Sequence, residues 1–195
     1  MLVYDRKSLN QEETSKSKPD NKEVVFTAKY FCNNCKEPVI VTGIGYTDDL
    51  QVGKYYPDLL LYSPLFFTPT IHLFRIHPRC PEEVRKQIIK SFSLFWSDPY
   101  SCVNKLRLSL ELLMDHAGIA HAWSPMNATD KIRKYKLHQR IDMFKKENQD
   151  IGNKLNAIKK IGNKGSHADD ILSVNEAIDA YELLEESLNE IYSQE

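Results

Sequence analysis

The sequence predicts an α+β protein in which a small β-rich module precedes an antiparallel helical bundle. Short runs rich in β-branched and aromatic residues, separated by Asn, Gly, Pro and Asp, fill residues 24–80 and are typical of strands. From residue 81 onward, apolar residues recur at the spacing of amphipathic helices. Residues 5–23 are almost wholly polar and favour a flexible arm, because they offer little apolar surface to offset ordering entropy. The predicted parts are therefore 1–23, 24–80 and 81–195.

Composition narrows the functional classes. The 195 residues include 26 Lys+Arg and 27 Asp+Glu, a net charge of −1, so any contact with nucleic acid needs a local basic patch. No apolar run approaches the roughly 18–20 residues that span a bilayer, and the first residues lack the apolar region of a signal peptide. Four cysteines in such a chain favour a reducing compartment. We therefore expect a cytoplasmic protein without a membrane partner.

The β-rich module carries a candidate metal site. Cys32 and Cys35 form a CxxC pair at a predicted turn, where two thiolates can share one tetrahedral zinc ion. His77 and Cys80, spaced HxxC at the far end of the module, are the nearest candidates for the other two ligands. A structural zinc would then tie the first strand to the last. In the alternative, the cysteines are unligated thiols and His77 is an ordinary loop residue. A redox pair is less favoured, because redox CxxC motifs open a helix.

Five helices are predicted after residue 81. Pro81 suits the first position of a helix, and Asp98 before Pro99 is typical of an N-cap. Gly118 is expected to end the second helix. Ser173 and Glu176 have the spacing of a capping box at the start of the fifth. With mostly short loops, these helices favour an antiparallel bundle.

The strongest charge asymmetry of the chain lies in residues 131–146. Seven basic residues there face a single acid, Asp142. We expect a helix whose basic outer face is either solvated or meets a phosphate backbone. The candidate nucleic-acid contacts in this segment are Arg133, Lys134, Lys136 and Arg140.

The stretch IGNKLNAIKKIGNKGSH, residues 151–167, predicts a helix that is followed by a cluster of polar side chains. Ile151, Leu155 and Ile158 share one apolar stripe. Gly162 is expected to stop the helix, since a residue without Cβ takes the left-handed conformation cheaply. The polar residues beyond it, Asn163, Lys164, Ser166 and His167, then form either an anion-binding or chemical site or a capped surface turn.

Three segments of the helical half resemble the bacterial domain-of-unknown-function family 4145: LRLSLELLMDHAGI at 106–119, Leu-x-x-Arg-Ile at 137–141 and AIKKIGNKGSH at 157–167. That family is similar to a branch of the HEPN (higher eukaryote and prokaryote nucleotide-binding) superfamily. The resemblance implies an antiparallel four-helix bundle that is commonly dimeric. Many superfamily members are metal-independent ribonucleases of toxin, antiphage and RNA-processing systems, and others are non-catalytic binding modules. Similar proteins often carry a Cys-rich N-terminal segment.

The resemblance also implies roles for particular residues. HEPN ribonucleases use an Arg, a polar residue and a His, spaced Arg-x4-6-His, in a site formed across a dimer. Carried over here, His167 is the acid/base, Asn163 the polar orienter and Lys159 the cation, with Lys160 and Lys164 as neighbouring contacts to nucleic acid. A His near neutral pKa can move a proton, and a cation stabilises charge on phosphorus.

The sequence departs from that pattern in two ways. Seven residues separate Lys159 from His167, and lysine lacks the planar fork with which arginine grips phosphate. Lys160 restores a six-residue gap but is still lysine.

Two functions follow from the resemblance. The first is a homodimeric, non-catalytic HEPN-like module that binds RNA, a nucleotide or a protein of a defence or restriction-type system. The second is a HEPN-type ribonuclease that uses His167 and requires no cofactor for catalysis. In the first, Gly162 and Gly165 allow a tight backbone, Asn163 caps the helix, and His167 bonds a backbone carbonyl or Glu111.

Overall fold

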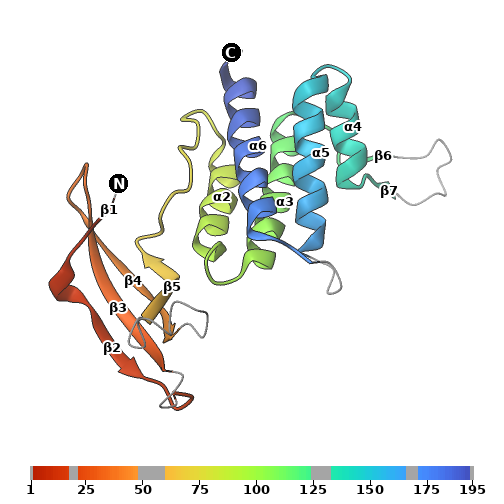
Figure 1. Ribbon diagram of the computed structural model, residues 1–195. Coiled ribbons are helices and arrows are strands. Elements are labelled where there is room, and N and C mark those ends of the chain that lie inside the picture. The colour runs from red at the N-terminus through yellow and green to blue at the C-terminus, as the bar shows by residue number, and fades with distance from the viewer. Residues whose placement is uncertain (1, 18–21, 48–59, 124–132, 166–170, 194–195) are drawn as a thin grey trace. The chain divides into compact units, whose positions relative to one another are not determined.

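The protein comprises two compact units, Met1–Ile71 and His72–Glu195. The computed structural model describes residues 2–17, 22–47, 60–123, 133–165 and 171–193. An antiparallel sheet forms the first unit, here called the sheet unit, and five helices dominate the second, the helical unit (Figure 1). The predicted α+β class is thereby confirmed. Within the described residues, no helix has both the length and the apolar character needed to cross a membrane.

The sheet unit is built around its third strand. In chain order its elements are β1 (Leu2–Tyr4), the 3-10 helix η1 (Arg6–Ser8), β2 (Asn10–Glu13), β3 (Glu23–Cys32), β4 (Pro38–Thr47) and β5 (Leu60–Thr68). β3, β4 and β5 pair antiparallel in that order, and both β1 and β2 pair with the other edge of β3. The strands predicted near residues 24–31, 38–46 and 58–67 therefore exist.

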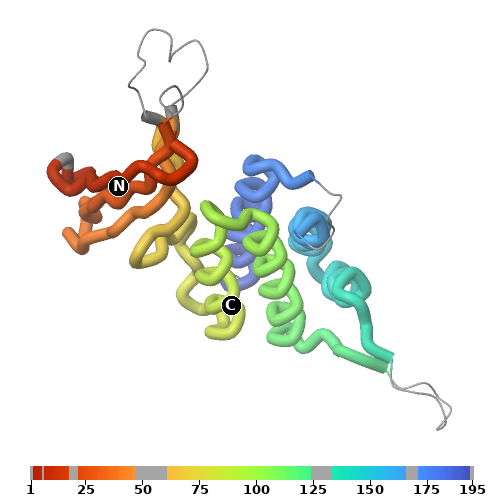
Figure 2. Tube along the Cα trace, turned by 90° about the horizontal axis from the view of Figure 1, so that it is seen from below, coloured from red at the N-terminus to blue at the C-terminus, as the bar shows by residue number. Residues whose placement is uncertain are grey.

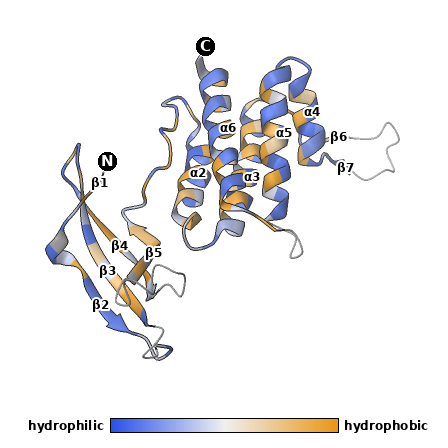
Figure 3. Ribbon diagram, in the orientation of Figure 1, coloured by the Kyte–Doolittle hydropathy of each residue, from blue (hydrophilic) through white to orange (hydrophobic). Residues whose placement is uncertain are grey.

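One face of this sheet carries a small apolar core. Phe26 and Ala28 of β3 and Val39 and Val41 of β4 are buried together, as alternation along a half-buried strand requires. Figure 3 shows the apolar character concentrated in β3, β4 and β5, whereas β2 is hydrophilic. Gly43 of β4 permits the close approach of β5, because an added Cβ there would lie 2.1 Å from the Ser63 carbonyl oxygen.

Two parts of the chain differ from the predicted organisation. The polar segment expected to be a flexible arm contains β2, whose backbone pairs with β3; backbone hydrogen bonding can order a strand that buries little of its own. The apolar run TIHLFRI, residues 70–76, forms no strand. Phe74 and Ile76 pack instead into the core of the helical unit, so that unit begins at His72 rather than at residue 81.

The helical unit contains α2 (Glu82–Leu94), α3 (Pro99–His116), β6 (Ala122–Trp123), β7 (Arg133–Lys134), α4 (Leu137–Lys145), α5 (Gln149–Lys164) and α6 (Val174–Ser193). α3 lies between α2 and α5 (Figure 1, Figure 2), and α5 also packs against α4 and α6. The two-stranded β6–β7 hairpin precedes α4. Leu106, Leu110, Leu155, Ile158 and Leu184 are fully buried in the common core.

The predicted helix termini at Asp98, Gly118 and Ser173 are confirmed. The Asp98 carboxylate accepts the Ser101 N–H at 3.0 Å, and Gly118 has φ 71° just past the end of α3. Ser173 and Glu176 bond reciprocally, with the Glu176 N–H donating to Ser173 Oγ at 3.1 Å and the Ser173 N–H donating to Glu176 Oε2 at 3.0 Å. These caps fix where α3 and α6 begin and where α3 ends.

Replacing Asp98 with Ala should lower the free energy of unfolding by about 1 kcal/mol at neutral pH, the usual cost of losing an N-cap. Hydrogen bonds from Ser101 hold the pKa of Asp98 below its ordinary value. The contribution is therefore complete above the unfolded-state pKa and is lost as the pH falls through the lowered folded-state pKa. Denaturant unfolding of wild type and Asp98→Ala across that range should show the difference shrinking in acid; a difference independent of pH would contradict this account.

Candidate functional site

A cavity of about 670 Å³ opens among α3, α4, α5 and the β6–β7 hairpin of the helical unit. It brings together residues that are far apart in the sequence: Arg107, Glu111, His121, Lys134, Tyr135, Lys136, Leu137, His138, Arg140, Lys159 and Asn163. Two of the predicted catalytic residues, Lys159 and Asn163, therefore share one cavity with three of the predicted nucleic-acid contacts.

Cationic side chains dominate the wall of this cavity. Arg107 Nη1 pairs with Glu111 Oε1 at 3.1 Å, as residues four apart on one face of a helix can do. Across the part of the chain that the structure describes, no carboxylate pairs with Lys134, Lys136 or Lys159. Three lysines with uncompensated charge around one concave surface attract anions.

Arg140 has a different place from the one that the sequence predicts. Instead of lying on an exposed basic face, it is only 3% exposed. Its guanidinium donates to the Glu111 carbonyl at 3.2 Å and to the Ile119 carbonyl at 2.8 Å, and it pairs with Asp115. Arg140 therefore joins α4 to the C-terminal part of α3, and it also lines the cavity.

One polar atom of Arg140 has no hydrogen-bond partner among the described residues. Its Nε is buried and makes no hydrogen bond to any described atom. An orphaned buried donor costs about 1–3 kcal/mol, which the other bonds of the Arg140 guanidinium have to offset.

Gly162 does not stop α5, contrary to the prediction. The helix continues to Lys164 with Gly165 as its C-cap, and Gly165 has an ordinary right-handed φ of −64°. Gly162 is instead a packing position: an added Cβ would lie 2.8 Å from Arg107 Cβ and 3.0 Å from the Val103 carbonyl oxygen. The glycine thus lets α5 approach α3 closely, which brings Lys159 and Asn163 to the same cavity as Arg107.

The basic segment near residue 133 also differs from the predicted continuous helix. Arg133 and Lys134 form β7, and α4 begins only at Leu137. Lys134 and Lys136 consequently reach the cavity from the hairpin and its link to α4. The hairpin is tied to the end of α3, because His121 Nε2 bonds Asp115 Oδ1 at 2.7 Å and Asp115 also pairs with Arg140.

The hairpin carries an exposed aromatic residue that sequence analysis does not single out. Trp123 is 42% exposed, and the Arg133 guanidinium lies over its ring, 5.8 Å from the centroid. Arg107 and His121 are likewise recognised as cavity residues only in the structure. A signal for Arg107 does exist in the sequence, because its pairing with Glu111 places both on one face of α3.

The remaining predicted contacts have other surroundings. Lys160 is exposed and lies outside the cavity lining. Lys164 bonds Glu176 at 2.6 Å and the Ile171 carbonyl at 3.1 Å, so its charge is already paired. His167 lies outside the described residues.

The four predicted metal ligands divide between the two units. Cys32 and Cys35 belong to the sheet unit, whereas His77 and Cys80 belong to the helical unit. The His77 ring stacks on Tyr192 at 5.6 Å, and Cys80 is 5% exposed within the helical core, where burial raises the pKa of its thiol to about 11. Among the described residues, no three His, Cys, Asp or Glu side chains lie close enough together to hold a metal ion jointly.

A family comparison covers most of the helical unit. Residues 90–195 match the family described as a domain of unknown function (DUF4145). The chain belongs to this family. The DUF4145 region begins within α2 and includes every residue that lines the cavity. Neither the curated proteins nor the solved structures yield a match to the chain.

Replacing Gly162 with Ala should destabilise the helical unit. The gain in helix propensity is about 1 kcal/mol, but a methyl group wedged between α5 and α3 typically costs about 1–3 kcal/mol, and the neighbours here include a backbone carbonyl. We expect a net loss in the free energy of unfolding, measured with denaturant. The control is Asn153→Ala, an exposed position on the same helix, which should leave stability unchanged or raise it. A stabilised Gly162→Ala would show that α5 does not need this approach.

Proposed function

We propose that the helical unit is a HEPN-like module that binds the phosphate groups of RNA or of a nucleotide in the cavity among α3, α4 and α5. The observation that carries the proposal is the cluster of Lys134, Lys136 and Lys159, whose charges no described carboxylate balances. As a non-catalytic interaction module, it would act as a homodimer in a cytoplasmic bacterial defence or restriction-type system.

The charge of the cavity supports an anionic ligand over a cationic or apolar one. Among the described residues of the lining, Glu111 is the one acidic residue, and Arg107 already neutralises it. Contacts of lysine and arginine with phosphates supply essentially all of the non-specific affinity of proteins for nucleic acids. Because the whole chain has a net charge of −1, binding has to depend on this local cluster and not on overall charge.

The β6–β7 hairpin supports a nucleic acid or nucleotide over a simple phosphate ion. Trp123 exposes ring surface, and the hairpin that carries it also contributes His121 and Lys134 to the cavity region. Base stacking on an aromatic side chain is worth about 1–3 kcal/mol and is tolerant of sequence. Phosphates held by the lysines would leave a neighbouring base free to stack on Trp123.

Reversing the charge of Lys159 should weaken the binding of labelled single-stranded RNA. Fluorescence anisotropy of wild type and Lys159→Glu at several salt concentrations would measure both the affinity and its salt dependence. Loss of one phosphate contact should reduce the slope of log affinity against log salt by about 1. The matched control is Lys90→Glu, an exposed lysine of α2 outside the cavity, which makes the same charge change. Equal weakening by both variants would contradict a localised site.

A second candidate function is a metal-independent ribonuclease. Lys159 and Asn163 both line the cavity and, four residues apart, share one face of α5; this supports a common phosphate contact for the cation and the polar residue implied by the family resemblance. His167 would supply the proton transfer. Incubation of labelled RNA with wild type and His167→Ala, with and without EDTA, decides between the candidates. EDTA-resistant cleavage that the mutant loses would establish the enzyme, whereas binding without cleavage would establish the non-catalytic module.

A further inference from the structure

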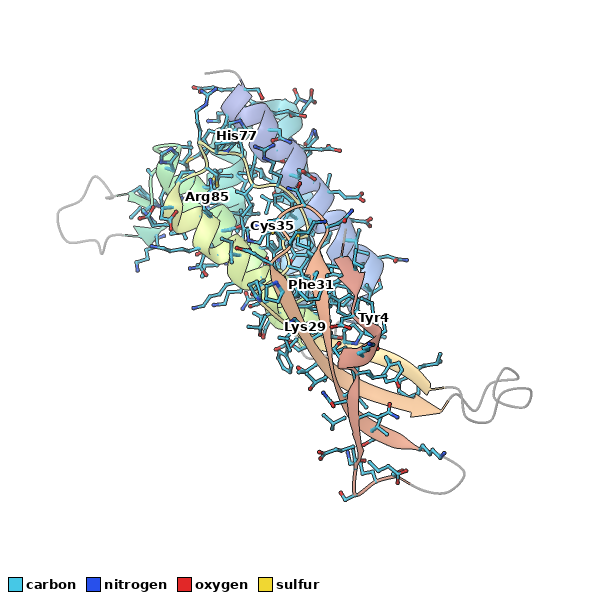
Figure 4. All side chains as sticks on the ribbon, turned by 90° about the vertical axis from the view of Figure 1, so that its left-hand side faces the viewer. Tyr4, Lys29, Phe31, Cys35, His77 and Arg85 are labelled. Atoms are coloured by element: carbon cyan, nitrogen blue, oxygen red, sulfur yellow. The ribbon has the colours of Figure 1, made fainter. Side chains whose placement is uncertain are left out.

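The turn that joins β3 and β4 is tight and carries both Cys32 and Cys35. The Cys32 N–H donates to the Glu37 carbonyl at 2.9 Å, and the Lys36 N–H donates to the Cys32 carbonyl at 2.9 Å. Lys36 completes the turn with φ 61°, a left-handed conformation that non-glycine residues rarely adopt. Figure 4 labels Cys35 in this turn. The local hydrogen bonds thus fix both cysteines on one tight loop.

The same loop places a carboxylate next to one of the cysteines. The Cys35 thiol donates to Glu37 Oε2 at 3.7 Å. Two cysteines spaced CxxC on one tight turn can present both thiolates to a single tetrahedral ion, and the Glu37 carboxylate is a further donor beside them.

Access to the pair is open. Cys35 is exposed and Cys32 is partly exposed, so an ion can reach both sulfurs without unfolding the sheet. The other two cysteines differ in this respect, because Cys80 and Cys102 are buried in the helical unit. Cys102 is also hydrogen-bonded to the Tyr181 hydroxyl at 3.0 Å.

We propose that the β3–β4 turn is a self-contained metal site in which the Cys32 and Cys35 thiolates bind one thiophilic d10 ion, Cu⁺ or Zn²⁺, without Cys80. Soft thiolate ligands select these ions over Mg²⁺ or Ca²⁺. Two thiolates suffice for Cu⁺, whereas Zn²⁺ would add water or another exogenous donor to complete its tetrahedron. The site is independent of the anion-binding cavity, which lies in the other unit.

The test is a metal titration of the reduced full-length chain under anaerobic conditions. Cu⁺ is added in competition with a chromophoric chelator, and Zn²⁺ in a separate series, followed by measurement of bound metal after desalting. Wild type and Cys80→Ser should each retain one equivalent of at least one of the two ions. Cys32→Ser and Cys35→Ser should lose it, with circular dichroism confirming that each variant is folded.

Substitution with Co²⁺ gives an independent count of the thiolates. The intensity of its sulfur-to-metal charge-transfer band should correspond to two thiolates in wild type and be unchanged in Cys80→Ser. Retention of neither ion by wild type would overturn the proposal. Loss of metal in Cys80→Ser, or a band of three-thiolate intensity, would overturn it in favour of a site that joins the two units. RNA binding by the same preparations is measured separately, so failure of one proposal does not decide the other.

Discussion

The buried guanidinium of Arg140 is the contact on which the arrangement of the candidate site depends. It bonds two carbonyls near the end of α3 and the carboxylate of Asp115. Burying a charged group on folding is costly unless the charge is paired and hydrogen-bonded. The packing of α4 in this position therefore depends on these partners of Arg140. Asp115 also bonds His121, and this contact positions the β6–β7 hairpin. The walls of the cavity are thus coupled through one ion pair.

Close helix packing supplies the remaining wall. Gly162 faces the backbone of α3 at Val103 and Arg107, and the helical repeat then sets Lys159 about one turn before it, with Asn163 directly after it. The same packing brings Arg107 next to the α5 residues. The cavity is therefore a consequence of how three helices are fixed together, and its charge comes from side chains that the fold leaves without acidic partners among the described residues.

Local patterns predict much of this protein. Helix spacing, the caps at Asp98 and Ser173 and the three long strands follow from near neighbours in the sequence, because each depends on hydrogen bonds or apolar faces within one element. The exceptions depend on distant contacts. From the sequence alone, Arg140 is predicted to be a surface cation, because its partner Asp115 lies 25 residues away. Gly162 is likewise predicted to stop a helix, because its contact with α3 is not visible in the sequence.

The candidate site is predictable only in part for the same reason. Lys159 and Asn163 can be singled out from the sequence because a family resemblance points to their segment. His121 and Trp123 gain significance only from the way in which the β6–β7 hairpin is held, and Arg107, for which the sequence offers only its spacing from Glu111, becomes a site residue once α3 is placed against α5. Two other segments also depend on distant partners. The polar segment 5–23 contains a strand because β3 offers it backbone partners. The apolar run 70–76 packs on helices instead of joining the sheet.

The central claim is that the cavity takes an anionic ligand, and nitrogen-edited NMR tests it most directly. Arg140 lines the cavity, and its Nε–H is a convenient reporter of that region, since it is buried and without a described partner. Titration of labelled protein with a short 5′-phosphorylated oligoribonucleotide should shift this resonance together with the backbone amides of Lys159 and Asn163, and Lys159→Glu should suppress the shifts. Binding that leaves these resonances in place, with changes confined to the sheet unit, would contradict the account.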